Sequence, residues 1–152
     1  MNCDSLQAKR VLVICTGNSA RSQMAEGLLR HLGGEQVQVF SAGSAPAEQI
    51  HSLAVRAMAE IGLDISAQKP KPLGDFLGRP FDYIIAVCSK AAEACPFCPG
   101  RAERLHWFYD DPAAVQGTGE AQMAAFRAVR DDMKLRITDW LASMSNNRGP
   151  LL

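Results

Sequence analysis

A cysteine and an arginine with five residues between them lie near the start of the chain. They are Cys15 and Arg21, within the stretch CTGNSARS at residues 15–22. The small residues between them allow a tight turn, and a turn that leads into a helix directs backbone N–H groups and partial positive charge toward one point. The arginine adds a planar fork that holds two oxygens of an anion. The spacing therefore predicts an oxyanion cradle with a nucleophilic cysteine at its base.

We expect the cradle to use every residue of this loop that follows the cysteine. The same positive field is expected to lower the pKa of the Cys15 thiol and to favour the reactive thiolate. The hydroxyl group of Ser19 or Ser22 is placed to donate a further hydrogen bond to the sulfur. The predicted oxyanion-binding residues are Thr16, Gly17, Asn18, Ser19, Ala20, Arg21 and Ser22.

The segments on either side of the loop have the patterns needed to position it. Residues 10–14, RVLVI, form a short apolar run typical of a buried strand. Residues 22–32 have apolar side chains at helical spacing, and the glycine pair at 33–34 ends that helix. Further along, the patterns predict strands at 37–43, 81–88 and 103–108, helices at 51–62 and 119–144, and a loop with one helical turn at 66–80.

This alternation predicts an α/β fold, with a four-stranded, mostly parallel sheet flanked by helices in three layers. We expect a single domain over residues 1–152, with its core at about 10–144. In such a sheet, ligands bind beyond the carboxyl ends of the strands. Cys15, Cys88 and the pair Asp110-Asp111 each come at the end of a predicted strand or just after it. We therefore expect these reactive side chains to meet at one edge of the sheet.

Composition narrows the class of protein. The chain has 152 residues, and its sixteen basic residues balance sixteen acidic ones, which argues against a nucleic-acid partner. No apolar run approaches the length of a membrane span, and the first ten residues lack the apolar core of a signal peptide. An odd number of cysteines in a chain without a secretion signal does not suggest a structural disulfide framework. We expect a cytoplasmic monomer without membrane contact; the cysteines are Cys3, Cys15, Cys88, Cys95 and Cys98.

Several motifs together resemble one known family. The loop and its flanks, VICTGNSARSQMAEG at 13–27, resemble the active-site loop of the low-molecular-weight protein tyrosine phosphatase fold. Within that fold, the chain is most similar to the thioredoxin-coupled arsenate reductases. The likeness extends from about residue 10 to residue 141. Its other motifs are SAG at 41–43, AMAEIGLDIS at 57–66, VC at 87–88, CP at 95–96, HWFYDDPA at 106–113 and FRAVRDDMKLRI at 126–137.

The resemblance implies a role for each reactive residue. Cys15 attacks the arsenic of arsenate, and Asp111 protonates the departing oxygen as general acid. Cys88 then attacks the adduct, which releases arsenite and leaves a Cys15–Cys88 disulfide. Cys95 attacks Cys88 in turn, and thioredoxin reduces the resulting Cys88–Cys95 disulfide. The resemblance implies no organic cofactor. Phosphate and sulfate are expected to bind as analogues of arsenate.

The chain departs from the family pattern at three places. Ala20 occupies a position where some relatives carry another cysteine, and Cys98 makes CPFC a C-x-x-C motif that competes for the role of Cys95. We expect no zinc there, because only His106 offers a nearby further ligand. Some relatives bind potassium through an asparagine, a glutamate, a serine and an aspartate. The first three match Asn18, Glu26 and Ser41, whereas Lys71 stands at the aspartate position, so we predict no bound metal and no potassium dependence.

Three alternatives stay open at this point. The first is a protein tyrosine or small phosphomonoester phosphatase that uses Cys15, Arg21 and Asp111, although the aromatic residues expected after Asp-Pro are missing in DPAAVQG. The second is a non-enzymatic oxyanion or redox sensor that signals through a disulfide. The third is arsenate reduction supported by glutaredoxin or a small thiol, in which Cys95 is unnecessary.

Overall fold

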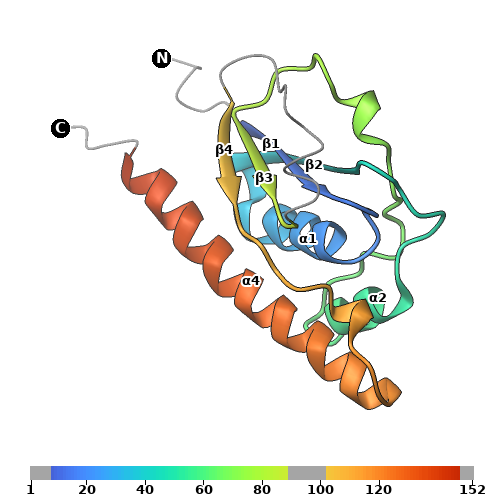
Figure 1. Cartoon of the computed structure of the whole chain (residues 1–152). Helices are drawn as coiled ribbons and strands as arrows, with labels where there is room; N and C mark the ends of the chain where they lie inside the picture. Colours follow the sequence, from blue (N-terminus) through green and yellow to red (C-terminus); the bar gives the residue numbers. More distant parts are fainter. Residues whose placement is uncertain (1–7, 89–101, 148–152) are drawn as a thin grey trace.

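The computed structural model describes residues 8–88 and 102–147, which are built around a four-stranded sheet. The strand order is β2-β1-β3-β4, and each pair of neighbouring strands is parallel (Figure 1). This confirms the predicted α/β fold, with a sheet that is parallel throughout. The strands are β1 (Lys9–Cys15), β2 (Val37–Gly43), β3 (Tyr83–Ala86) and β4 (Glu103–His106).

Three described helices and three short 3-10 turns lie between these strands or follow the last of them. The predicted helix at 51–62 is shorter in the structure: it begins after His51, whose extended backbone makes it the N-cap, and it ends at Ala59, three residues before Gly62 with its φ of 81°. The ring Nδ1 of His51 accepts a hydrogen bond from the Leu53 N–H. The helices are α1 (Arg21–Gly33), α2 (Ser52–Ala59) and α4 (Gly119–Asn147), and the 3-10 turns are η2 (Gly34–Gln36), η3 (Leu73–Asp75) and η4 (Pro112–Ala114).

The hydrophobic core is built from side chains of the sheet, of α1 and α2, of the segment 73–81 and of one face of α4. Helix α1 packs on β1 and β2, and α4 packs against α1 and α2, as the diagonal path of α4 in Figure 1 shows. The buried apolar side chains of α4 recur at the spacing of one helix face. They are Met123, Phe126, Met133, Ile137, Leu141 and Met144. Although α4 has 29 residues, no helix within the described ranges is apolar enough over its length to cross a membrane.

The strand register brings the carboxyl ends of the strands to one edge of the sheet. Cys15 pairs with Gly43, and Ala86 pairs with both Ile14 and His106. The chain segments that follow β1, β3 and β4 therefore begin side by side. As predicted, this edge carries Cys15, Cys88 and the two aspartates that follow β4.

Candidate active site

The loop between β1 and α1 has its carbonyl groups turned outward. Four of them accept hydrogen bonds from the segment that follows β2. The donors are the N–H groups of Ser44, Ala45, Ala47 and His51, which reach the carbonyls of residues 15, 16, 17 and 19 at 2.8–3.2 Å. In a trans peptide the C=O and N–H groups point in opposite directions. The N–H groups of this loop are therefore directed inward, as an anion cradle requires.

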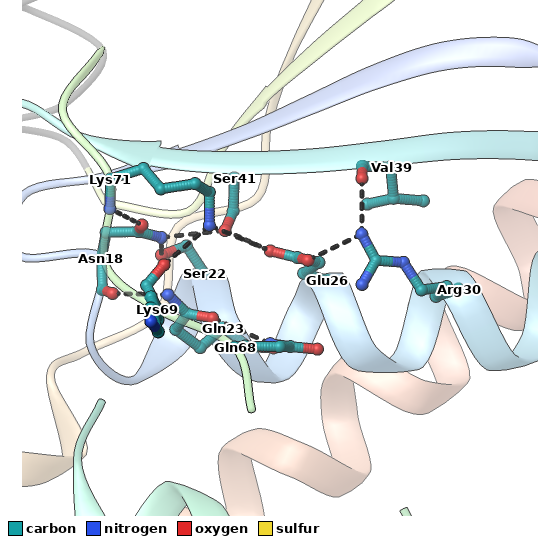
Figure 2. Close-up of polar contacts among 10 residues, drawn as sticks. All are labelled: Asn18, Ser22, Gln23, Glu26, Arg30, Val39, Ser41, Gln68, Lys69 and Lys71. Atoms are coloured by element: carbon teal, nitrogen blue, oxygen red, sulfur yellow. Dashed lines mark hydrogen bonds and ion pairs between the residues drawn. The ribbon is translucent and has the colours of Figure 1, made fainter. Parts of the chain in front are cut away.

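Asn18 is the central residue that holds the loop in this shape. It is fully buried and has a φ of 49°, the left-handed region that few residues other than glycine adopt. Its side-chain amide donates to Ser22 at 2.7 Å and to Ser41 at 3.0 Å, and its Oδ1 accepts from the Lys71 N–H at 2.8 Å (Figure 2). Its carbonyl accepts from Gln23 at 2.8 Å. These bonds offset a backbone strain of about 1–3 kcal/mol.

The inward face of the loop encloses a small cavity of about 190 Å³. Helix α1 begins at Arg21, so its N-terminus faces the same space. Asp111 and Ala113 close the cavity from the segment after β4. Its loop residues are Cys15, Thr16, Gly17, Asn18, Ser19, Ala20 and Arg21, all of which the sequence predicts. Ser22 is not among the lining residues: its buried hydroxyl faces Asn18, and its part in anion binding stays a prediction.

Arg21 joins the cradle to the segment that carries the predicted general acid. Its Nη1 donates a hydrogen bond to the carbonyl of Tyr109 at 2.8 Å. The Tyr109 N–H in turn donates to the carbonyl of Val87, next to Cys88. Asp111 caps η4 by accepting from the Ala113 N–H at 3.0 Å, and it is exposed at the cavity mouth. Arginine and acid thus face one space, as predicted.

Cys88 is the second sulfur at this site. Both Cys15 and Cys88 are buried and in the thiol form, with exposed fractions of 3% and 6%. The Cys88 thiol lies beside that of Cys15, where it is the largest influence on the Cys15 pKa, and its sulfur lies 3.2 Å from the hydroxyl oxygen of Thr16. The structure therefore places a second thiol directly beside the predicted nucleophile.

The predicted lowering of the Cys15 pKa is wrong for this pair of thiols. The neighbouring Cys88 thiol and, next, burial raise the pKa of Cys15 above its ordinary value. The positive charge of Arg21 and the Thr16 N–H lower this pKa but do not prevail. The pKa of Cys15 is thus governed chiefly by a residue outside the loop.

The residues that match the family's potassium ligands do meet behind the cradle, but their partners do not fit a metal ion. Ser41 donates to Glu26 at 2.5 Å, and Arg30 binds the other carboxylate oxygen at 2.8 Å. The Lys71 ammonium lies 3.7 Å from Glu26 (Figure 2). Burial lowers the pKa of Lys71, and the charge of Glu26 counteracts this shift. Two cations therefore already face the carboxylate of Glu26.

A second, larger cavity of about 440 Å³ adjoins the cradle and shares Thr16, Arg21 and Asp111 with it. We call it the outer chamber. Its other lining residues are Cys88, Phe108, Tyr109 and Asp110. Sequence reasoning did not assign Phe108 or Tyr109 to the site. The alternation along HWFY could have indicated Phe108. In a strand-like segment it places Trp107 inside and His106 and Phe108 on the exposed side.

The remaining predicted site residues fall outside the described ranges. Cys95 and Cys98 belong to the segment 89–101, so the Cys88–Cys95 disulfide and the C-x-x-C motif stay predictions. The segment 44–51 contributes through its backbone N–H groups alone, which no side-chain pattern reveals. His51, interpreted from the sequence as a helix-start residue, has that role.

Comparison with known proteins agrees with this geometry. The family model for low molecular weight phosphotyrosine protein phosphatase matches residues 10–149. An arsenate reductase of Halalkalibacterium halodurans is 43% identical over 132 residues, covering 87% of this chain and 94% of that protein. A solved arsenate reductase in the phosphate binding state has a TM-score of 0.71 and 29% identity, and covers 89% of this chain and 98% of its own.

A thioredoxin-dependent arsenate reductase of Corynebacterium glutamicum gives a TM-score of 0.72 at 33% identity, covering 91% of this chain and 62% of that one. Fold and site together define a cysteine-based, oxyanion-binding α/β protein, and the chain belongs to the low molecular weight phosphotyrosine protein phosphatase family. Within that family it groups with the arsenate reductases.

Proposed function

We propose that this protein is an oxidoreductase that reduces arsenate to arsenite through a relay of three thiols, Cys15, Cys88 and Cys95. The observation that carries the proposal is the contact between the Cys88 and Cys15 thiols at the base of an anion cradle. A phosphatase needs a nucleophilic cysteine, an arginine and an acid, but it needs no second thiol there. The similarity to arsenate reductases over most of the chain supports the same substrate.

The first step uses the cradle as in phosphoryl transfer. Loop N–H groups and Arg21 hold three oxygens of arsenate, and the Cys15 thiolate attacks the arsenic. An arsenic–sulfur bond forms while one arsenic–oxygen bond breaks, and Asp111 gives its proton so that the oxygen leaves as water. The exposed position of Asp111 at the cavity mouth suits this role.

The second step moves the electrons. The Cys88 thiolate attacks the sulfur of Cys15, a Cys15–Cys88 disulfide forms, and the electron pair of the arsenic–sulfur bond stays on arsenic. Arsenic gains two electrons and leaves as arsenite, while the two cysteines lose two. The contact of Cys88 with Cys15 and the Thr16 hydroxyl group supports this direct attack.

The third step restores the nucleophile. Cys95 attacks Cys88, which frees Cys15 and leaves a Cys88–Cys95 disulfide. A thioredoxin with two thiols then reduces that disulfide and becomes oxidised itself. The solved thioredoxin-dependent relative supports thioredoxin as the reductant. We further propose that the enzyme works as a cytoplasmic monomer, which size-exclusion chromatography and cell fractionation test.

Coupled turnover tests the relay. Arsenate-dependent oxidation of NADPH is measured with thioredoxin and thioredoxin reductase, for the unmodified protein and for Cys88→Ser. We expect many turnovers for the first and none for the second. The Cys95→Ser variant separates the thioredoxin-coupled relay from reduction by a small thiol. If Cys95→Ser loses the thioredoxin-coupled rate, the relay is supported. If Cys95→Ser reduces arsenate as fast as the unmodified protein with glutaredoxin or glutathione as reductant, the relay is contradicted.

A phosphatase is the second candidate, because Cys15, Arg21 and Asp111 all line the cradle and the family model is that of a phosphatase. Hydrolysis of p-nitrophenyl phosphate that survives Cys88→Ser, without arsenate turnover in the unmodified protein, would favour it. Slow turnover in both assays would favour a sensor that signals through its disulfide.

A further inference from the structure

Phe108 stands apart among the apolar side chains of the described ranges. Three large hydrophobic residues there are about half exposed or more: Leu77 at 51%, Phe108 at 49% and Leu135 at 70%. Leu77 follows η3 and Leu135 lies on α4, and neither lines the outer chamber. Phe108 does line that chamber, together with Cys88 and Arg21. Its position beside a reactive thiol, and not its exposure alone, therefore distinguishes Phe108.

The ring of Phe108 is held in place from one side. It stacks on His106, with ring centroids 5.4 Å apart and planes 19° apart. Trp107 between them is buried, and its ring is nearly perpendicular to that of Trp140 of α4, with ring centroids 5.6 Å apart. The backbone that carries Phe108 is thus anchored, and Phe108 presents a pre-positioned apolar surface. Rigid aromatic side chains of this kind are common anchors in protein interfaces, because little side-chain freedom is lost on binding.

The two cavities differ in size and in lining, which suits them to two different ligands. The inner cradle of about 190 Å³ holds the anion-binding groups, whereas the outer chamber of about 440 Å³ adds an aromatic ring, a tyrosine and Asp110. An inorganic oxyanion has no group that uses an apolar ring. A reductant must bring a sulfur to the cysteines of the relay, and Cys88 lies on the wall of the outer chamber. The outer chamber therefore suits the second event.

We propose that Phe108, supported by His106, is the apolar docking contact for the protein dithiol that reduces the enzyme, a reductant of the thioredoxin class. This proposal rests on the proposed function and states where the redox partner of that function binds. One thiolate of the partner attacks the enzyme disulfide and forms a mixed disulfide, and its second thiol then releases the enzyme with two thiols. The partner loses two electrons and the enzyme disulfide gains them. The carboxylates of Asp110 and Asp111 at the same mouth favour a partner surface that is apolar and not acidic around its cysteine.

The test measures reduction separately from arsenate chemistry. The protein is first oxidised with diamide, which forms the disulfide without arsenate. Its reduction is then followed with thioredoxin, thioredoxin reductase and NADPH, and in parallel with dithiothreitol. For Phe108→Ser we expect the apparent KM for thioredoxin to rise about tenfold, with the dithiothreitol rate unchanged. Phe108→Tyr keeps the ring and is expected to restore the KM.

Matched controls are Leu77→Ser and Leu135→Ser, which remove apolar side chains elsewhere that are at least as exposed and should leave the KM for thioredoxin unchanged. Circular dichroism and the melting temperature check that each variant is folded. An unchanged KM in Phe108→Ser would overturn the proposal. So would an equal loss with dithiothreitol, or a changed KM for p-nitrophenyl phosphate or arsenate, because Phe108 would then act on the cradle. Failure of arsenate to oxidise the unmodified protein would count against the proposed function alone.

Discussion

The cradle and the segment after β4 face the same space but are built in opposite ways. The cradle is densely bonded and rests on buried side chains: Asn18, Ser22 and Gln23 have no exposed surface, and each carbonyl from residue 15 to residue 20 has a partner. The segment that carries Asp111 is anchored through Tyr109 and the η4 cap, and its aspartates are exposed. A site that must recognise a rigid anion is preorganised. A site that must deliver a proton and admit a partner is left open.

Among the changes that distinguish these two regions, the largest effect is expected from removing the acid on the open side. Asp111→Asn keeps an oxygen that can accept from the Ala113 N–H, so η4 stays capped, but it has no proton to give. We expect kcat/KM for arsenate to fall about 10²- to 10⁴-fold. The matched control is Asp110→Asn, which should change it little. Equal losses in both variants would show that the acid is not assigned correctly.

A smaller but still large effect is expected from disturbing the rigid side. A Cβ at Gly43 would lie 2.5 Å from the Thr16 carbonyl oxygen and 3.1 Å from the Asn18 nitrogen, so the loop has to shift. We expect Gly43→Ala to lower kcat/KM about 100-fold and to weaken competitive inhibition by phosphate. Gly74→Ala, where no atom lies within 4 Å of the added group, is the control. Unchanged phosphate inhibition in Gly43→Ala would contradict a tightly preorganised cradle.

Sequence reasoning succeeded where a local pattern determines the outcome. The β1 strand, the loop from Cys15 to Arg21 and the start of α1 are encoded by neighbouring residues, and the structure has them as predicted. The parallel register then follows from the alternation of elements, which is why Cys88 and Asp111 arrive beside the loop.

It failed where the result depends on contacts between distant residues. The prediction of a lowered Cys15 pKa considered the loop alone, whereas the contact with Cys88, 73 positions away, reverses its direction. The bond from Arg21 to the Tyr109 carbonyl involves a backbone group that carries no residue signature. The exposure of Phe108 depends on how the segment after β4 packs on α4, which one strand pattern does not specify.

The contact between Cys15 and Cys88 predicts in which direction the pKa of Cys15 changes when Cys88 is replaced. Because Cys88 is the largest cause that raises the pKa of Cys15, Cys88→Ala should lower that pKa. The thiolate fraction at neutral pH then increases, and Cys15 reacts faster with iodoacetamide there, while the rates at high pH converge. Mass spectrometry of the Cys15 peptide across a pH series measures this. A pH profile that stays in place or moves to higher pH would mean that burial, and not Cys88, controls the nucleophile.

The smallest effect is expected behind the cradle, where Lys71 faces Glu26. If this ammonium supplies the positive charge that potassium supplies in some relatives, the unmodified protein should have the same kcat/KM in KCl and in NaCl at equal ionic strength. Lys71→Asp replaces the cation with an oxygen ligand, so activity should fall by a few fold in NaCl and recover in part in KCl.

Lys71→Met removes the charge without adding a ligand and should show the loss without the recovery. Both variants keep the backbone N–H that binds Asn18, so the difference between them isolates the cation site from the loop. Potassium stimulation of the unmodified protein would show that the Lys71–Glu26 contact does not take the place of the metal.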